Sequence, residues 1–321
     1  MNAPKSSLLA ATVLLLAGSA SAADTPLVVA SVKPIHSLVA SIMEGVGKPK
    51  LIVEGAASPH TYNLKPSNAS TLEKANVVFW VGPGLEAFLE KPLEALGSDA
   101  TVVALEDAPG LKKLGFREGG PFEAHSDEDK GDHDHAAEAH DHEEDRHHGY
   151  DTHLWLDPMN AKAMAAEITT SLVAADPANA LTYQANAKAL DDRLDALDKE
   201  IASTITPVKD KPFIVFHDAY QYFENRYGVH VAGSITVSPE TIPGAERIAE
   251  IHRKVTDLGA TCVFAEPQFE PRLIDVVIEG TQAKSGVLDP EAATLKEGPD
   301  LYFDLMRGIA NSVKDCLSRS S

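Results

Sequence analysis

Short apolar runs, many of them β-branched, alternate along the chain with longer segments in which apolar positions recur at helical spacing. The runs that we expect to form strands are residues 27–32, 51–53, 77–81 and 101–104 in the first half and 213–216, 229–235 and 262–265 in the second. The helical segments between them include residues 35–44, 85–94, 243–257 and 271–283. This alternation predicts an α/β fold with two lobes, each a parallel sheet flanked by helices.

One helical segment is much longer than the others. Residues 177–205 contain no proline or glycine after the first position. Their apolar stripe is formed by Leu181, Ala185, Ala189, Leu194, Leu197 and Ile201. At 1.5 Å per residue the helix is about 42 Å long, the length of a domain. We therefore predict an N-terminal lobe over residues 24–176, a linking helix over 177–205 and a C-terminal lobe over 206–321.

The first 23 residues have the pattern of a secretory signal peptide. Lys5 supplies a positive start, residues 8–17 form a short apolar core, and Ala20-Ser21-Ala22 is a small-residue cleavage site. No later segment approaches 18 uninterrupted apolar residues, and no cysteine follows the cleavage site. We therefore expect an exported, soluble protein with neither a lipid anchor nor direct membrane insertion.

The net charge is −20, from 48 acidic and 28 basic residues, which disfavours nucleic acid as a partner. Residues 121–149 carry −9 of this charge, because their eleven acidic residues face only Lys130 and Arg146. The same segment holds seven of the 13 histidines: His125, His133, His135, His140, His142, His147 and His148. So polar a composition predicts a disordered loop. Either it captures metal, which its histidines favour, or it is a solvated tether.

Three other histidines lie where strands are predicted to end. His217 follows the apolar run 213–216, His60 follows the strand at 51–53, and His153 comes just after the acidic segment. Ligands of open α/β sheets bind at the carboxyl ends of strands, and three histidines suffice for a zinc site. Each histidine taken alone is more often structural. Asp289 is a candidate fourth ligand, although an aspartate before proline is also a common cap, and Glu266 is a weaker candidate.

The two cysteines, Cys262 and Cys316, form an even pair in a chain that we expect to be exported. A disulfide is favoured over metal ligation, with two separate buried thiols as the remaining alternative.

Five motifs along the mature chain resemble the ZnuA-type periplasmic zinc-binding proteins of ABC transporters. They are residues 58–67 (SPHTYNLKPS), 76–86 (NVVFWVGPGLE), 153–158 (HLWLDP), 216–224 (FHDAYQYFE) and 261–269 (TCVFAEPQF). The resemblance implies two α/β lobes joined by one long helix, with zinc bound in the cleft between them. It also implies a periplasmic monomer that captures Zn²⁺, is not an enzyme, and delivers its cargo to a membrane permease.

The resemblance also implies roles for individual residues. Its metal ligands match His60, His153 and His217, and its disulfide matches the two cysteines. Relatives that select manganese tend to carry glutamate at position 217, so histidine there favours zinc, as ligand softness does. Some members have a glutamate just before the first histidine, whereas this chain has Pro59. The fourth ligand is therefore expected to be Asp289 or water.

Three other functions are compatible with the same residues. A manganese or iron receptor of the same family would use the same fold. A zinc hydrolase would use three histidines and a water, but the chain has no HExxH helix to supply a general base. A secreted zinc buffer would bind mainly through residues 121–149.

Overall fold

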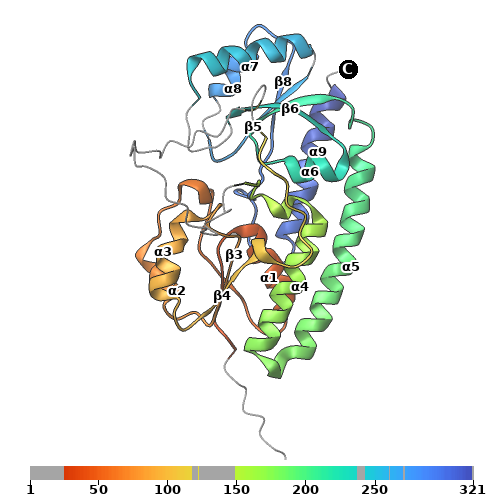
Figure 1. Cartoon of the computed structure of the whole chain (residues 1–321). Coiled ribbons are helices and arrows are strands. Elements are labelled where there is room, and N and C mark those ends of the chain that lie inside the picture. Colours follow the sequence, from red (N-terminus) through yellow and green to blue (C-terminus); the bar gives the residue numbers. More distant parts are fainter. Residues whose placement is uncertain are drawn as a thin grey trace, which may run out of the picture.

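The computed structural model describes residues 25–117, 122, 149–236, 243–259, 261–269 and 272–319. They form two four-stranded parallel sheets, one in each half of the chain, flanked by helices (Figure 1). This architecture confirms the predicted α/β fold with two lobes. The predicted signal peptide and all but the two residues 122 and 149 of the histidine-rich segment lie outside the described residues.

The first sheet has the strand order β2-β1-β3-β4. Its strands are β1 (Val28–Ala30), β2 (Lys50–Leu51), β3 (Val77–Trp80) and β4 (Thr101–Ala104). The helices of this lobe are α1 (Lys33–Ile42), α2 (Pro66–Leu72) and α3 (Ala87–Leu96). The two central strands, β1 and β3, are buried along their whole length, because helices cover both faces of a parallel sheet.

The second sheet has the order β6-β5-β7-β8. Its strands are β5 (Pro212–His217), β6 (His230–Thr236), β7 (Cys262–Ala265) and β8 (Lys284–Val287), and its helices are α6 (Gln221–Tyr227), α7 (Ala245–Leu258) and α8 (Arg272–Ile278). The apolar pattern did not predict β8. This edge strand is largely exposed and begins Lys-Ser-Gly, so it lacks the apolar run that marks a buried strand.

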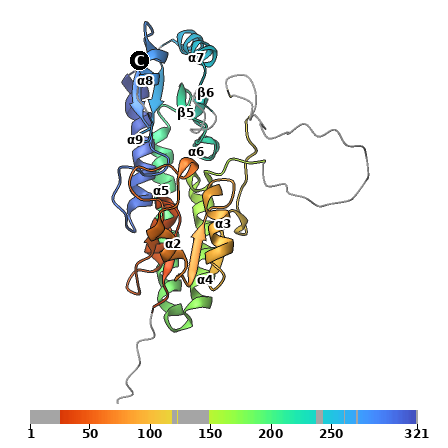
Figure 2. The ribbon, with the colours of Figure 1, turned by 90° about the vertical axis from the view of Figure 1, so that its left-hand side faces the viewer.

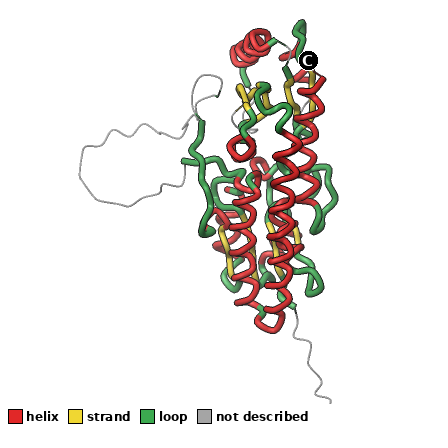
Figure 3. Tube along the Cα trace, turned by 90° about the vertical axis from the view of Figure 1, so that its right-hand side faces the viewer, coloured by secondary structure: helices red, strands yellow, loops and turns green. Residues whose placement is uncertain are grey.

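Three long helices run beside the two sheets (Figures 2 and 3). They are α4 (Pro158–Ala175), α5 (Ala180–Ile205) and α9 (Leu301–Arg319). The predicted long helix is α5, preceded by one 3₁₀ turn at Pro177–Asn179. Helix α5 packs against α1 and α4 of the first lobe and against α6 and α9. Helix α9 contacts both α1 and β8, so a second long helix also packs on both lobes beside the linking helix α5.

The buried face of α5 differs from the predicted stripe in its first half. Leu181 is 83% exposed, and Ala185 and Ala189 are also exposed. The buried positions are instead Tyr183, Leu190, Leu194, Leu197, Ile201 and Ile205. Ala189 lies five residues before Leu194 and therefore off that face of the helix, whereas Leu190 and Tyr183 lie four and eleven residues before Leu194 and keep helical spacing. The Tyr183 side chain is fully buried. Its hydroxyl donates to Asp176 Oδ2 at 2.9 Å.

One apolar core runs through both lobes, and strand β5 divides it from a smaller second core. Phe213 and Val215 point into the shared core, whereas Ile214 and Phe216 point into the second core under α7 and α8. This alternation follows from the period of two along a strand. Because α5 and α9 contribute to the shared core, the lobes are packed against common helices rather than joined by a free hinge.

Cys262 of β7 and Cys316 of α9 form a disulfide, which confirms the predicted pair. Within the described part of the chain, no helix is both long enough and apolar enough to cross a bilayer.

Candidate metal centre

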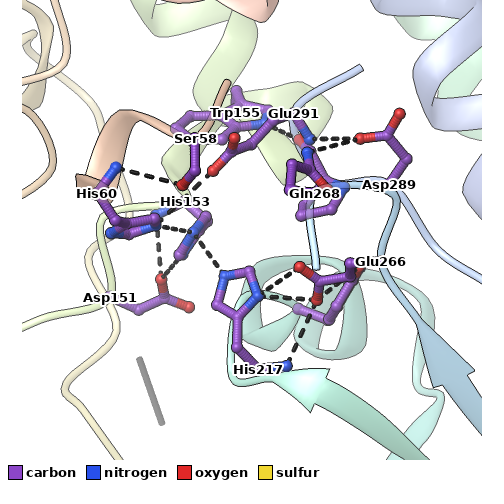
Figure 4. A network of polar contacts seen from close by, with 12 residues as sticks. Ser58, His60, Asp151, His153, Trp155, His217, Glu266, Gln268, Asp289 and Glu291 are labelled. Carbon is purple, nitrogen blue, oxygen red and sulfur yellow. Dashed lines mark hydrogen bonds and ion pairs between the residues drawn. The ribbon is translucent and has the colours of Figure 1, made fainter. Parts of the chain in front are cut away.

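The three predicted histidines come together from three separate segments (Figure 4). His60 lies in a 3₁₀ turn, Pro59–Thr61, whose first amide groups are capped by Ser58: its Oγ accepts from His60 N at 3.3 Å. His153 immediately precedes the turn Leu154–Leu156, and His217 is the last residue of β5. Of the three, only His217 ends a strand, as the strand-end pattern predicted; His60 and His153 are positioned by 3₁₀ turns instead.

The ring nitrogens face one another. His153 Nε2 lies 3.3 Å from His60 Nε2 and 3.3 Å from His217 Nε2. Nitrogens bound to a tetrahedral zinc at 2.0–2.1 Å are about 3.3–3.4 Å apart, which is the edge of that tetrahedron. Two of the three nitrogen pairs thus have the spacing of a zinc site, and one ligand nitrogen from each ring lies within 4.8 Å of the others.

Two buried carboxylates hold the other sides of these rings. Asp151 Oδ1 accepts from His153 Nδ1 at 2.7 Å, and Glu266 Oε2 accepts from His217 Nδ1 at 2.7 Å. A histidine that donates from Nδ1 presents the lone pair of Nε2, so both rings are oriented to bind a metal through Nε2. Glu266, a weak ligand candidate from the sequence, therefore contacts the side of the His217 ring that faces away from the metal position. Asp151 was missed, although an aspartate two residues before a histidine is a usable signal.

The environment shifts the pKa values of two of the three histidines in opposite directions. Burial, and then the neighbouring His153 and His217, lower the pKa of His60 well below its ordinary value. Burial also acts to lower the pKa of His217, but the Glu266 carboxylate outweighs it and raises that pKa. His60 is consequently held neutral, the form in which imidazole binds metal.

Hydrogen bonds from both lobes fix this centre. Trp155 Nε1 donates to the carbonyl of Pro290 at 2.8 Å, and Tyr302 OH donates to the carbonyl of Trp155 at 2.7 Å. Tyr222 OH of α6 donates to the carbonyl of Asp151 at 2.6 Å. The segment bearing His153 is thus tied to the second lobe and to α9, which limits how far the rings can separate.

Asp289, the proposed fourth ligand, is used as a cap in the described structure. Its Oδ1 accepts from Gln268 Nε2 at 3.2 Å and from Glu291 N at 3.3 Å, and its Oδ2 accepts from Thr294 N at 3.4 Å. Its carboxylate is not part of the group formed by the three histidines. A role for Asp289 at the metal stays a prediction, and these contacts favour the alternative reading of a turn cap.

Another acid lies closer to the rings. Glu291 is 6% exposed, and its Oε1 lies 3.8 Å from His60 Nε2. Burial raises the pKa of Glu291 well above its ordinary value, and the carboxylates of Glu266, Asp289 and Glu86 add to this effect. No sequence pattern indicates Glu291, because its approach to His60 depends on the path of the loop after β8.

Residues that flank the histidine-rich segment lie beside the centre. Arg117 Nε donates to Asp218 Oδ2 at 3.0 Å, and Asp218 follows His217 directly. At the other end, Gly115 pairs with Tyr150, which precedes Asp151. The seven histidines of the segment itself lie outside the described residues.

Comparison with known proteins decides the family. Residues 28–316 match the family described as "ZnuA: Zinc-uptake complex component A periplasmic". The chain belongs to the ZnuA family. The "High-affinity zinc uptake system protein ZnuA" of Brucella suis biovar 1 (strain 1330) is 58% identical over 324 residues, covering 94% of this chain and 95% of that protein. The protein of the same name from Yersinia pestis is 38% identical over 308 residues, covering 96% of each.

A solved structure gives the same result for the fold. The "periplasmic zinc binding protein TroA from Treponema pallidum" superposes with a TM-score of 0.75 at 20% identity, covering 91% of this chain and 99% of that chain. At this identity the likeness concerns the fold alone. The family assignment confirms the resemblance inferred from the five motifs, and the two-lobed fold with its long helix is that of this solved neighbour.

Proposed function

We propose that the protein is a periplasmic receptor that captures Zn²⁺ with high affinity and delivers it to the membrane permease of an ABC transporter. The observation that carries this proposal is that His153 Nε2 lies at the spacing of a zinc tetrahedron from both His60 Nε2 and His217 Nε2, inside a chain of the ZnuA family. Zinc is the cargo here and not a resident cofactor. Export by the N-terminal signal peptide and action as a monomer belong to the same proposal.

Zinc is favoured over manganese by the donors themselves. Three imidazoles form a nitrogen-rich site, whereas manganese prefers carboxylates, carbonyls and water. The two carboxylates nearest His153 and His217 are engaged with Nδ1 atoms, on the far side of each ring from Nε2. A titration in which Mn²⁺ displaces bound zinc at comparable concentrations would contradict this part of the proposal.

Capture and release are proposed to involve limited movement of the lobes. Helices α5 and α9 pack on elements of both lobes, and the shared core continues through them. Binding should therefore order the loops that carry His60 and His153 without a wide closure. Small-angle scattering of the metal-free and zinc-bound protein should give nearly the same radius of gyration, and a large compaction would contradict the proposal.

The central experiment is the stoichiometry and affinity of zinc measured by calorimetry. The full mature chain, His60→Ala and a deletion of residues 121–149 are compared. We expect the deletion to keep one tight site and His60→Ala to lose it. If the deletion instead removes nearly all binding, the protein is a histidine-rich zinc buffer, and if His60→Ala keeps the tightest site, the assignment of the centre is wrong.

The histidine-rich segment is proposed to gather zinc near the centre. Its two flanks are held next to His217 and His153, as described above, so ions bound there would be released close to the three rings. The deletion is expected to slow zinc loading from dilute solution while leaving the equilibrium affinity of the tight site unchanged. Stopped-flow loading against a chelator measures this, and equal loading rates would show that the segment is a tether.

A further inference from the structure

Glu291 is a buried acid with an unused oxygen. Its Oε2 is inaccessible to solvent and has no hydrogen-bond partner among the described residues, while Oε1 faces His60 Nε2 at 3.8 Å. Figure 4 shows the side chain directed toward the histidine rings. A carboxylate buried without partners is costly, so such a group in a stable fold calls for a ligand or a charge that it serves.

The loop that carries Glu291 is held in a strained shape. Ala292, the next residue, has a φ of 59°, in the left-handed region that alanine rarely adopts. Lys33 Nζ stabilises this shape by donating to the carbonyls of Ala292 at 3.0 Å, Ala293 at 2.9 Å and Leu295 at 3.2 Å. Strain of this kind persists where surrounding contacts over-determine the conformation, as at ligand-binding sites.

Contacts on the other side of the loop also hold its conformation. The Asp289 cap accepts from the backbone N–H of Glu291, and the carbonyl of Pro290 accepts from Trp155 Nε1. The backbone around Glu291 is therefore held on both sides, by Lys33 of the first lobe and by the Asp289 carboxylate. In this conformation the Glu291 side chain extends toward His60, as Figure 4 shows.

The side of the ring that Glu291 approaches is the informative one. Asp151 and Glu266 contact Nδ1 atoms, behind the metal-facing nitrogens. Glu291 approaches Nε2 of His60, the same atom that lies 3.3 Å from His153 Nε2. The Glu291 carboxylate thus shares the side of the ring on which a metal would sit, at a distance only slightly longer than the edge of a zinc tetrahedron.

We propose that Glu291 is the fourth metal-contacting residue of this site, giving one carboxylate oxygen that completes an N₃O donor set around the captured Zn²⁺. This inference rests on the proposed zinc site and assigns its open position to a residue other than Asp289. The Glu291 carboxylate lies 3.8 Å from His60 Nε2, and a small rotation of the carboxylate would bring one oxygen into contact with the metal. Three neutral imidazoles leave the charge of Zn²⁺ unchanged, and Glu291 places a negative charge directly on the metal.

The test compares two substitutions of the same kind on one loop. Glu291→Gln removes the charge at constant size, and Glu297→Gln makes the same change at an exposed position of the loop. Zinc affinity is measured by competition with a chelator. The visible absorption of the Co²⁺-loaded protein reports the donor set independently of affinity, and thermal melting of the metal-free variants checks that both fold.

We expect Glu291→Gln to weaken zinc binding about 10–100-fold and to shift the Co²⁺ absorption bands, with Glu297→Gln unchanged in both. Lys33→Met should weaken binding in the same direction but less, because it loosens the loop and keeps the carboxylate. Unchanged Co²⁺ bands in Glu291→Gln overturn the inference, whether or not affinity falls, because a fall alone would mean that Glu291 acts through His60.

His153→Ala separates this inference from the proposed function. If His153→Ala abolishes tight zinc binding while Glu291→Gln leaves affinity and Co²⁺ bands intact, the three-histidine site holds and the role of Glu291 is wrong. If His153→Ala keeps tight binding, the proposed site itself is wrong, and the Glu291 inference falls with it.

Discussion

His217 Nδ1 lies 2.7 Å from Glu266 Oε2, and both side chains are almost completely buried. The two residues are 49 positions apart and come from the ends of the neighbouring strands β5 and β7. Because Glu266 accepts the Nδ1 proton, it fixes both the orientation of the ring and the nitrogen that is free for metal.

Glu266→Ala should therefore weaken zinc binding about 10–100-fold, since the His217 ring loses its orienting acceptor. Glu266→Gln should weaken it less, because the amide oxygen can still accept from Nδ1. The matched control is Glu279→Ala, an exposed acid on the same lobe. Chelator competition measures all three, and an affinity of Glu266→Ala within twofold of wild type would contradict the role given to this pair.

Glu86 should make stability depend on pH in a predictable direction. Its carboxylate is fully buried beside Ser31 and accepts from Val81 N at 3.0 Å and Gly82 N at 2.9 Å. Burial outweighs these hydrogen bonds and raises the pKa of Glu86 from 4.5 to about 7. Between these two pH values the folded protein keeps a proton that the unfolded chain has released.

The stabilising contribution of the protonated Glu86 is complete below about pH 4.5 and is lost as the pH rises through about 7. Wild type should lose about 3 kcal/mol relative to Glu86→Gln between these limits. Urea unfolding of the metal-free proteins at several pH values measures the difference. The control Glu94→Gln, an exposed residue of α3, should track wild type at every pH. If the difference in unfolding free energy between wild type and Glu86→Gln does not change with pH, the prediction is wrong.

Two glycine-to-alanine changes should have opposite effects on stability. Gly82 has a φ of +153°, and a Cβ there would lie 2.2 Å from the Glu106 carboxylate. Gly82→Ala should destabilise the protein by about 1–3 kcal/mol, because the end of the buried Glu106 side chain has to move. Gly308 lies in α9 with open space around it, so Gly308→Ala should stabilise by about 0.5–1 kcal/mol. Denaturant midpoints measure both, and equal midpoints would contradict the packing described.

The disulfide should contribute stability without contributing to the metal site. It closes a loop of 54 residues between β7 and α9. In the chain-entropy model the double change Cys262→Ser with Cys316→Ser costs about 4 kcal/mol of unfolding free energy. One tight zinc site should remain below the lowered melting temperature. Loss of that site in a variant that is still folded would show that the cysteines take part in binding.

The sequence predicted the two-lobed fold and the three clustered histidines because both leave local signals. Buried parallel strands appear as continuous apolar runs, and His217 stands directly at the end of one. Strand β8 lacks such a run, and in the first half of α5 several apolar residues lie off the buried face, so each needed the tertiary packing to be assigned.

The approach of Glu291 to His60 could not be predicted, for a different reason. Asp289 and Glu291 are two residues apart in the sequence, and local pattern favoured Asp289 because it follows an apolar run. Which of the two acids approaches His60 is decided by the left-handed Ala292 and by Lys33, which comes from the far end of the chain. A contact across more than 250 residues leaves no trace in local spacing.

A crystal structure of the full mature protein with one equivalent of zinc, located by its anomalous scattering, tests the central claim most directly. The account predicts a single zinc on the Nε2 atoms of His60, His153 and His217, at about 2.0–2.1 Å from each. Zinc bound elsewhere at one equivalent, with these three rings left uncoordinated, would contradict it.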